Sequence, residues 1–447
     1  MPQKITPQVL RGMRDFLPER MILRRYVMDL LRDVFESFGF EPLETPAIEY
    51  AETLEGKFGE EGDKLLYRFE DRGGRRVALR YDLTVPLARV VALHGELVRP
   101  WKRYHMAPVW RAEKPQKGRY REFWQCDVDT VGTKSTLADA EAVNVVYLAL
   151  QRLGFDRFVV KINNRKILSA LSQYAGVPAA EASTIYRAID KLDKVGREAV
   201  AGELEESGLE PGVVARLLDL LSESADDATV LQHTGERLAA YPEGVEGVRE
   251  LESLLSYLDA AGVPRGFRRV DLSMVRGMDY YTGPIFETVV EEPKIGSVSG
   301  GGRYDKLIGL FSREEVPATG VSFGLERIID VIEELGMRPA SVRRTVAEAL
   351  VTVFGPELVG DSLRLSGELR AQGLKVETYL GEERLGAQIR YAVRKGIPLA
   401  VILGPDEAAR GEGVLRNLGT ETQSAVPQAE LAAAIRGALA RQAESRH

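Results

Sequence analysis

The sequence predicts an α+β protein that combines an antiparallel strand core, an inserted helical segment and a C-terminal α/β domain. Residues 109–128 alternate large and polar side chains on both sides of a Gly/Lys/Pro-rich loop, as a long antiparallel hairpin does. Residues 164–260 are dense in Ala, Leu and Glu and are mostly helical in pattern. From residue 349 onward, strand and helix patterns alternate, which is typical of an α/β domain.

The remaining elements follow from periodicity. Residues 19–38 place apolar side chains at helical spacing, which predicts an amphipathic helix, and residues 137–153 predict another. Residues 40–50 form an extended segment interrupted by two prolines. Further strand patterns occupy residues 75–83, 101–113 and 267–290. The C-terminal order is strand, helix, strand, helix, strand, strand and helix, over residues 349–354, up to 371, 374–380, 384–394, 398–404, 413–418 and 427–441.

The composition is that of an ordinary globular protein and excludes several classes. The 447 residues are 44% hydrophobic and 28% charged, which argues against a disordered, collagen-like or membrane-spanning chain. Cys126 is the only cysteine, so an internal disulfide or a zinc knuckle is impossible. No apolar leader pattern and no run of about 18 apolar residues occurs. We therefore expect a cytoplasmic protein with no membrane span and no protein-bound zinc.

The net charge of −7 is unevenly distributed. Residues 176–262 hold seven Lys/Arg against 18 Asp/Glu, so the acidity belongs to the helical segment. Residues 99–121 hold eight Lys/Arg against one Glu. Such a basic run can hold phosphates, although on composition alone a solvated charged face is the simpler explanation.

One short motif points to a different class of enzyme. Residues 320–324 match the G-x-S-x-G nucleophile elbow of α/β-hydrolases. That fold needs its base histidine after the serine, and only His447 follows. The hydrolase interpretation is therefore poor, and no H-E-x-x-H pair supports a zinc enzyme.

Several segments in order resemble class II aminoacyl-tRNA synthetases. Arg111 and Glu113 in WRAE, the loop that follows and FWQ resemble motif 2 of that class. Residues 320–327 resemble motif 3, and Pro46 after the first long helix resembles the motif 1 proline. Narrower motifs are similar to those of the histidyl-tRNA synthetase family: RGMRDFLP at 11–18, KPQKGRYREF at 114–123, VRGMDYYTG at 275–283 and GGGRYD at 300–305.

The resemblance implies a fold and a reaction. The class II core is a six-stranded antiparallel sheet flanked by helices, with a helical insertion and a C-terminal α/β anticodon-binding domain, in a homodimer. We expect the catalytic core in residues 1–168 and 263–337, the insertion in 169–262 and the anticodon-binding domain in 345–447. The family joins L-histidine to AMP, using ATP with Mg²⁺, and then transfers the histidyl group to the 3'-terminal adenosine of tRNA(His).

The resemblance also assigns the ATP site. A carboxylate that attacks the α-phosphate of ATP needs charge neutralisation and alignment, and the family's pattern gives this catalytic task to Arg111 and Arg276. Arg327 is expected to hold the γ-phosphate of a bent ATP, and Glu113 to meet the adenine amino group. For any one of these arginines alone, a surface salt bridge would be the better explanation.

The histidine site is assigned in the same way. The family's pattern places Asp82, Thr84 and Gln125 around the α-ammonium group, whereas Asp129 and Tyr281 contact the imidazole and Tyr280 packs nearby. Glutamates more often stand at the positions of Asp82 and Asp129 in bacterial members, and YREFWQCDVD resembles the eukaryotic and archaeal form. The shorter carboxylates leave their hydrogen-bond reach to be determined.

For tRNA, the resemblance assigns the basic loop with Lys117, Arg119 and Arg121 to the acceptor end, and the C-terminal domain to the anticodon. Residues 345–447 nevertheless hold 12 Lys/Arg against 13 Asp/Glu, so any basic patch there must come from arrangement in space.

Two alternatives share this core. One is a non-catalytic synthetase paralogue that regulates ATP phosphoribosyltransferase; such paralogues usually lack the anticodon domain and lose phosphate-binding arginines, which this chain retains. The other is a different ATP-dependent ligase on the same fold, which would not explain RGMDYYTG.

Overall fold

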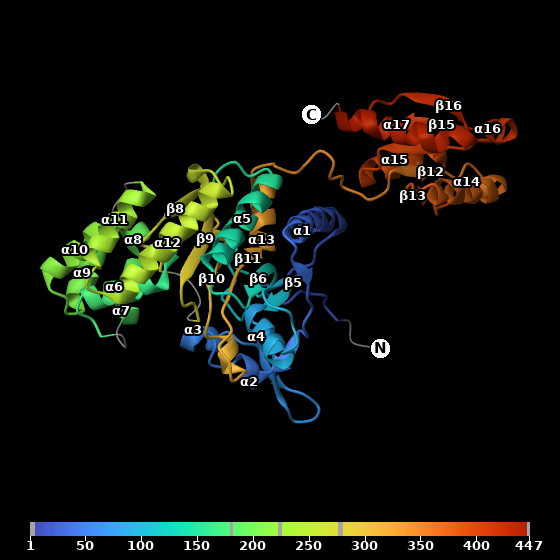
Figure 1. The fold of residues 1–447 in the computed structure, drawn as a ribbon. Helices are drawn as coiled ribbons and strands as arrows, with labels where there is room; N and C mark the ends of the chain where they lie inside the picture. Colours follow the sequence, from blue (N-terminus) through green and yellow to red (C-terminus); the bar gives the residue numbers. More distant parts are fainter. Residues whose placement is uncertain (1–4, 179–181, 222–225, 276–279, 445–447) are drawn as a thin grey trace. The chain divides into compact units, whose positions relative to one another are not determined.

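The computed structural model divides the chain into two compact units, residues 1–14 with 27–336 and residues 15–26 with 337–447 (Figure 1). It describes residues 5–178, 182–221, 226–275 and 280–444.

The main sheet of the first unit has eight strands. These are β1 (Glu41–Pro42), β5 (Trp101–Trp110), β6 (Glu122–Val131), β7 (Phe158–Asn164), β8 (Arg268–Val270), β9 (Pro284–Val290), β10 (Ser297–Arg303) and β11 (Ala318–Gly324). Their order is β1-β5-β6-β11-β10-β9-β7-β8. The six inner strands are all antiparallel, and the short edge strands β1 and β8 run parallel to β5 and β7. The expected antiparallel core is confirmed, with a short parallel strand added at each edge.

Strand β10 can form only because it is rich in glycine. A Cβ atom built on Gly301 would lie 2.1 Å from the carbonyl oxygen of Gly320 and 2.7 Å from Cα of Val321, on the neighbouring strand β11. Side chains at this point would force the two backbones apart. The glycines that make this segment look like a loop in the sequence are therefore the condition for its pairing as a strand.

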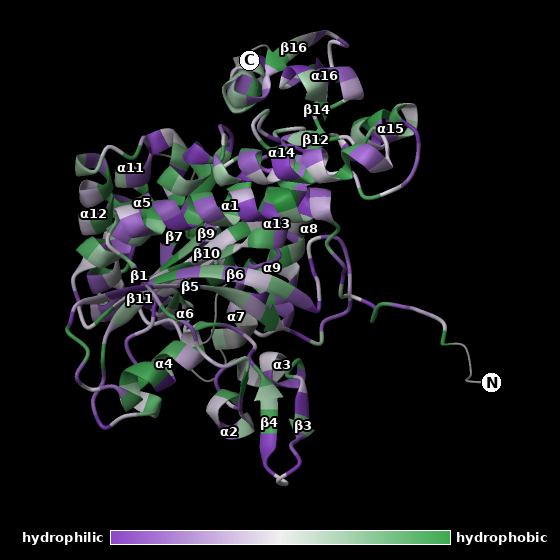
Figure 2. Cartoon of the chain, turned by 90° about the vertical axis from the view of Figure 1, so that its right-hand side faces the viewer, coloured by the Kyte–Doolittle hydropathy of each residue, from purple (hydrophilic) through white to green (hydrophobic). Residues whose placement is uncertain are grey.

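Three helices cover one face of this sheet: the part of α1 (Pro18–Ser37) from Val27 onward, α5 (Thr136–Arg152) and α13 (Leu325–Glu334) (Figures 1 and 2). Phe35 of α1 packs against the rings of Phe323 and Tyr104, with centroids 5.6 and 5.9 Å away. Helix α5 begins where the side chain of Ser135 accepts a hydrogen bond from the backbone N–H of Leu137, which satisfies a free amide of its first turn.

Smaller elements lie beyond the other face of the sheet (Figure 2). They are helices α2 (Ala51–Leu54), α3 (Gly59–Lys64) and α4 (Thr84–Leu93), and a separate sheet of β2 (Ile48–Tyr50), β4 (Arg76–Leu79) and β3 (Arg68–Glu70). The strand expected at residues 75–83 is β4, so it belongs to this separate sheet and not to the main one.

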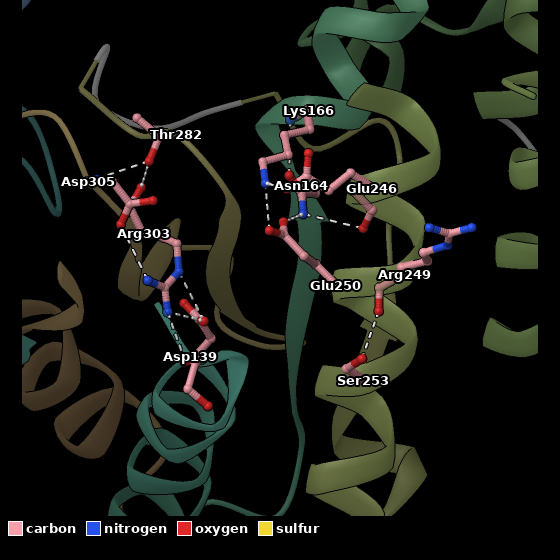
Figure 3. Close-up of polar contacts among 12 residues, drawn as sticks. Asp139, Asn164, Lys166, Glu246, Arg249, Glu250, Ser253, Thr282, Arg303 and Asp305 are labelled. Atoms are coloured by element: carbon pink, nitrogen blue, oxygen red, sulfur yellow. Dashed lines mark hydrogen bonds and ion pairs between the residues drawn. The ribbon is translucent and has the colours of Figure 1, made fainter. Parts of the chain in front are cut away.

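The helical segment follows β7. It contains α6 (Arg165–Tyr174), α7 (Ala182–Ile189), α8 (Leu192–Val195), α9 (Arg197–Glu206), α10 (Pro211–Leu221), α11 (Asp227–Arg237) and α12 (Pro242–Ala260). Helix α12 is tied to the junction of β7 and α6 by polar contacts (Figure 3). Glu250 accepts hydrogen bonds from Asn164, at 2.7 Å, and from Lys166, at 2.6 Å, and Lys166 also pairs with Glu246 at 2.7 Å.

The second unit has a five-stranded sheet in the order β13-β12-β14-β15-β16. Its strands are β12 (Ala349–Val351), β13 (Val376–Thr378), β14 (Leu399–Ile402), β15 (Glu412–Asn417) and β16 (Gln423–Pro427), and its helices are α14 (Val359–Ala371), α15 (Leu385–Lys395), α16 (Pro405–Arg410) and α17 (Leu431–Glu444). The alternating order predicted from the sequence is found, and α16 and β16 are additions to it. Across the described ranges of the chain, no helix is long and apolar enough to cross a membrane.

We expect Gly301→Ala to destabilise the fold by about 3 kcal/mol or more, because the added methyl group meets backbone atoms that cannot move independently. Gly300→Ala is the matched control, since a Cβ atom there would meet the Phe286 carbonyl oxygen at an ordinary 3.6 Å. Urea unfolding of the two variants and the parent measures the difference. Equal stability of the two variants would contradict the close approach of β10 and β11.

Candidate active site

A cavity of about 520 Å³ lies against the main sheet and gathers most of the predicted site residues. Successive residues of a strand point to opposite faces. In β6, Gln125, Asp127 and Asp129 line the cavity, so Cys126 and Val128 point to the other face. The predicted residues that line the cavity are Asp82, Thr84, Arg111, Glu113, Arg119, Gln125, Asp129, Tyr280, Tyr281 and Arg327.

Asp129 lies in a fully buried ionic contact. Its Oδ2 is 2.7 Å from Nη2 of Arg103, which is 0% exposed, and the hydroxyl of Tyr304 donates to its Oδ1. Arg103 and Asp129 occupy directly opposite positions of the β5–β6 ladder. Burial raises the pKa of Asp129, and Arg103 and Tyr304 act in the opposite direction by stabilising the carboxylate.

Asp82 occupies the start of α4. Its Oδ1 accepts a hydrogen bond from the backbone N–H of Val85, at 3.1 Å, and its Oδ2 accepts one from the hydroxyl of Tyr280, at 3.2 Å. Burial raises the pKa of Asp82 to about 6, although the Val85 amide and Arg111 favour the ionised form. At neutral pH this carboxylate can therefore accept hydrogen bonds from an ammonium group.

Asp127 is a cavity residue that the sequence motifs did not indicate. It is 2% exposed, and burial raises its pKa to about 8. Ser322, directly opposite it on β11, accepts a hydrogen bond of 2.8 Å at Oγ from the amide nitrogen of Gln125. The information was present in the sequence, because Asp127 lies midway between Gln125 and Asp129 and must share their face of the strand.

Two arginines that line the cavity are each held by several contacts. The guanidinium of Arg111 lies 4.2 Å from the ring centroid of Tyr81 and 5.0 Å from that of Phe123, and its Nε donates to the Tyr81 carbonyl at 3.1 Å. Arg327 donates to the carbonyls of Gly118, at 2.8 Å, and Ser297, at 2.7 Å. Burial lowers the pKa of Arg327, as do the positive charges of Arg119 and Arg111. This cluster of cations suits a polyphosphate.

Two of the predicted tRNA contacts do not line this cavity. Lys117 pairs with Glu334 at 2.7 Å on the surface and borders a neighbouring cavity of about 440 Å³. Arg121 donates from Nε to the Glu113 carbonyl, at 3.0 Å. Its backbone N–H donates to the Gly12 carbonyl, at 2.8 Å, and so anchors the N-terminal segment. Arg276 lies outside the described residues.

The arginine of the GGGRYD motif, Arg303, has a structural role. Arg303 is buried, and its Nη2 lies 2.5 Å from Oδ2 of Asp139 on helix α5 (Figure 3). Its guanidinium also donates to the backbone carbonyls of Thr133, at 2.9 Å, and Ser135, at 3.0 Å. These contacts hold β10 against α5. The tyrosine of the motif, Tyr304, donates a hydrogen bond to Asp129.

Within the parts of the chain that the structure describes, no group of three His, Cys, Asp or Glu side chains is placed to hold a metal ion.

A six-stranded antiparallel sheet with this cavity on one face is the architecture of a class II aminoacyl-tRNA synthetase. Within that class, the chain belongs to the histidyl-tRNA synthetase family. The family model for histidyl-tRNA synthetase matches residues 12–328, and the model for an anticodon binding domain matches residues 348–437.

Individual proteins agree with this assignment. The chain is 44% identical to histidine–tRNA ligase of Gloeobacter violaceus and 45% identical to that of Aeropyrum pernix, in both cases over 96% of this chain and 98% of the relative. The crystal structure of histidyl-tRNA synthetase from Nostoc sp. PCC 7120 superimposes with a TM-score of 0.86 and 34% identity, over 97% of this chain and 99% of that one.

We expect Arg103→Met to cost about 3–5 kcal/mol of stability, because Asp129 is left as a buried charge without its cation. In this variant the pKa of Asp129 in the folded protein rises further. Folding is therefore favoured at low pH, where Asp129 is protonated, and this contribution is lost as the pH rises through the pKa of the folded protein. The loss relative to the parent should therefore be smaller at pH 5 than at pH 8 in urea unfolding. Arg72→Met, an exposed arginine, is the control, and a pH-independent loss would contradict the role of the ion pair.

Proposed function

We propose that this chain is a histidine–tRNA ligase, which activates L-histidine with ATP and transfers the histidyl group to tRNA(His). The observation that carries the proposal is that one cavity holds both a group of cations and a group of buried carboxylates. Arg111, Arg119 and Arg327 line it, and so do Asp82, Gln125 and Asp129. The cations suit the polyphosphate of ATP, and the carboxylates suit the ammonium group and imidazole of histidine.

The first step joins two anions. A carboxylate oxygen of histidine bonds to the α-phosphorus of ATP, the bond from that phosphorus to the bridging oxygen breaks, and pyrophosphate leaves with the electron pair. Arg111, fixed between two aromatic rings, lowers the repulsion at the α-phosphate without having to reorient. Arg327 holds the γ-phosphate, and Glu113 accepts from the adenine amino group.

Arg276 is the second catalytic cation of the proposal and also contacts ATP. Its assignment rests on its place in the VRGMDYYTG motif. In the second step, a hydroxyl of the 3'-terminal adenosine of tRNA attacks the histidyl carbonyl and AMP leaves.

Histidine binds beside the buried carboxylates of the cavity. Asp82, Thr84 and Gln125 surround the α-ammonium group, and Asp129 and Tyr281 contact the imidazole, with Tyr280 beside them. Support comes from the buried carboxylate of Asp82 and from Asp129, whose negative charge is stabilised by Arg103. Selectivity for histidine follows because a smaller side chain would leave these buried polar groups without partners.

Several further features are proposed from the family alone. These are Mg²⁺ that enters with the phosphates of ATP, acceptor-end contacts by Lys117, Arg119 and Arg121, a homodimer, a cytoplasmic location, and the domain limits 1–168, 169–262, 263–337 and 345–447. Glu287 and Glu326 line the cavity with Arg327 and supply oxygen atoms of the kind that Mg²⁺ prefers.

The regulatory-paralogue alternative is not favoured. Arg111 and Arg327 line the cavity as phosphate-binding residues should, and the chain carries the anticodon-binding domain.

Amino-acid-dependent ATP/pyrophosphate exchange tests the proposal directly. With the purified chain and each of the twenty amino acids, we expect exchange with histidine alone, and charging of tRNA(His) when that tRNA is added. Folded protein that binds histidine but supports no exchange would favour the regulatory paralogue.

We expect Arg111→Ala to lower histidine-dependent exchange by about a hundredfold or more, because a preorganised charge at the phosphate is removed. Arg152→Ala, at an exposed position at the end of α5, is the matched control. Exchange rates and thermal unfolding are measured together. A near-normal rate in folded Arg111→Ala would remove this residue from the reaction.

A further inference from the structure

We propose that Asp127 is a specificity-determining residue, which donates a hydrogen bond to one imidazole nitrogen of histidine while Asp129 accepts from the other. The inference rests on the proposed function, and it adds a residue that the motif resemblance does not assign.

The position of Asp127 supports this role. It lies in β6 between Gln125 and Asp129, on the same face, and all three line the cavity. Although its side chain is 2% exposed, Oδ1 has no hydrogen-bond partner among the residues that the structure describes. A buried polar atom without a partner is costly unless a ligand completes it.

The two aspartates have different surroundings, which gives them different chemistry. Asp129 forms an ion pair with Arg103 and accepts a hydrogen bond from the hydroxyl of Tyr304, and both contacts favour its carboxylate form. The groups that face Asp127 act on its proton in opposite directions. Asp129 on the same strand and Asp82 before α4 favour the protonated form, whereas Arg103 on β5 and Ser322 on β11 favour the carboxylate. Tyr281, and His105 on β5, also face this side chain.

The balance of these groups leaves Asp127 protonated at neutral pH. Burial and the two neighbouring acids raise its pKa to about 8, and Arg103 offsets only part of this shift. His105, directly opposite in the ladder, adds no positive charge because burial lowers its pKa to about 2. Asp127 can therefore donate a hydrogen bond where Asp129 can only accept.

This pair matches the neutral imidazole. A neutral imidazole has one N–H donor and one acceptor nitrogen, whereas the imidazolium has two donors. With Asp129 as acceptor and Asp127 as donor, both ring nitrogens are satisfied at once. The arrangement also explains how a short aspartate serves at position 129, because the second ring nitrogen is contacted from position 127.

The test is histidine-dependent ATP/pyrophosphate exchange at saturating ATP, measured from pH 6 to pH 9.5. For Asp127→Ala we expect the KM for histidine to rise about 10- to 100-fold, with the KM for ATP unchanged, because one imidazole contact is lost. Asp127→Asn retains an N–H donor, and we expect it to recover most of this loss. Asp156→Asn, an exposed aspartate beyond α5, is the matched control.

The pH profile separates a binding role from a structural one. In the parent, kcat/KM for histidine should fall above about pH 8 as Asp127 loses its proton and its donor. In Asp127→Asn this component of the alkaline decline should disappear, while titration of the α-ammonium group of histidine is common to both proteins.

Two results would overturn the inference. One is a KM for histidine in folded Asp127→Ala equal to that of the parent, and the other is an unchanged alkaline decline in Asp127→Asn. If Asp127→Ala does not fold, the pH profile of kcat/KM for histidine in Asp127→Asn alone tests the inference. A parent protein without histidine-dependent exchange would instead overturn the proposed function, so the two failures are distinguishable.

Discussion

The buried ion pair between Arg103 and Asp129 is the interaction on which the rest of the site depends. Three carboxyl groups, those of Asp82, Asp127 and Asp129, are buried in one cavity, and burial of such groups is costly without compensation. Arg103 compensates from the strand opposite, at a position fixed by the β5–β6 register. A slip of one residue in this register would turn Arg103 to the helix-covered face of the sheet. The register of the hairpin therefore also determines whether the charge of Asp129 is compensated.

The fold was predictable where a strand has one apolar and one polar face. Strands β5 and β6 alternate because one face packs on helices and the other lines a cavity, so the hairpin was visible in the sequence. Strand β7 was not predicted, since it directly precedes a long helical pattern. Strand β10 was not visible either, because three successive glycines are typical of loops. The structure explains the middle one, since a Cβ atom on Gly301 would lie 2.1 Å from the Gly320 carbonyl oxygen of β11.

The motifs predicted several residues that share one cavity, but they did not predict which contacts hold each side chain in place. Asp82, Gln125 and Asp129 line one cavity as the resemblance implied. That Arg303 pairs with Asp139 in the core could not be deduced from its motif, because burial is a property of the tertiary structure. Asp127 was not predicted, because the motifs do not assign it. The two-residue period of a strand nevertheless places it on the same face as Gln125 and Asp129.

The buried carboxylates of β6 and the arginine of α13 are connected through the backbone ladder between β6 and β11. Asp129 lies opposite Gly320, Asp127 opposite Ser322 and Gln125 opposite Gly324. Helix α13 begins directly after Gly324, so Arg327 stands one turn beyond the strand that carries this ladder. The amide of Trp124 bonds to Glu326 at 2.9 Å and closes the same connection from the other side. The spacing between the buried carboxylates of β6 and Arg327 is therefore set by main-chain hydrogen bonds, so the β6–β11 register positions both groups in the cavity.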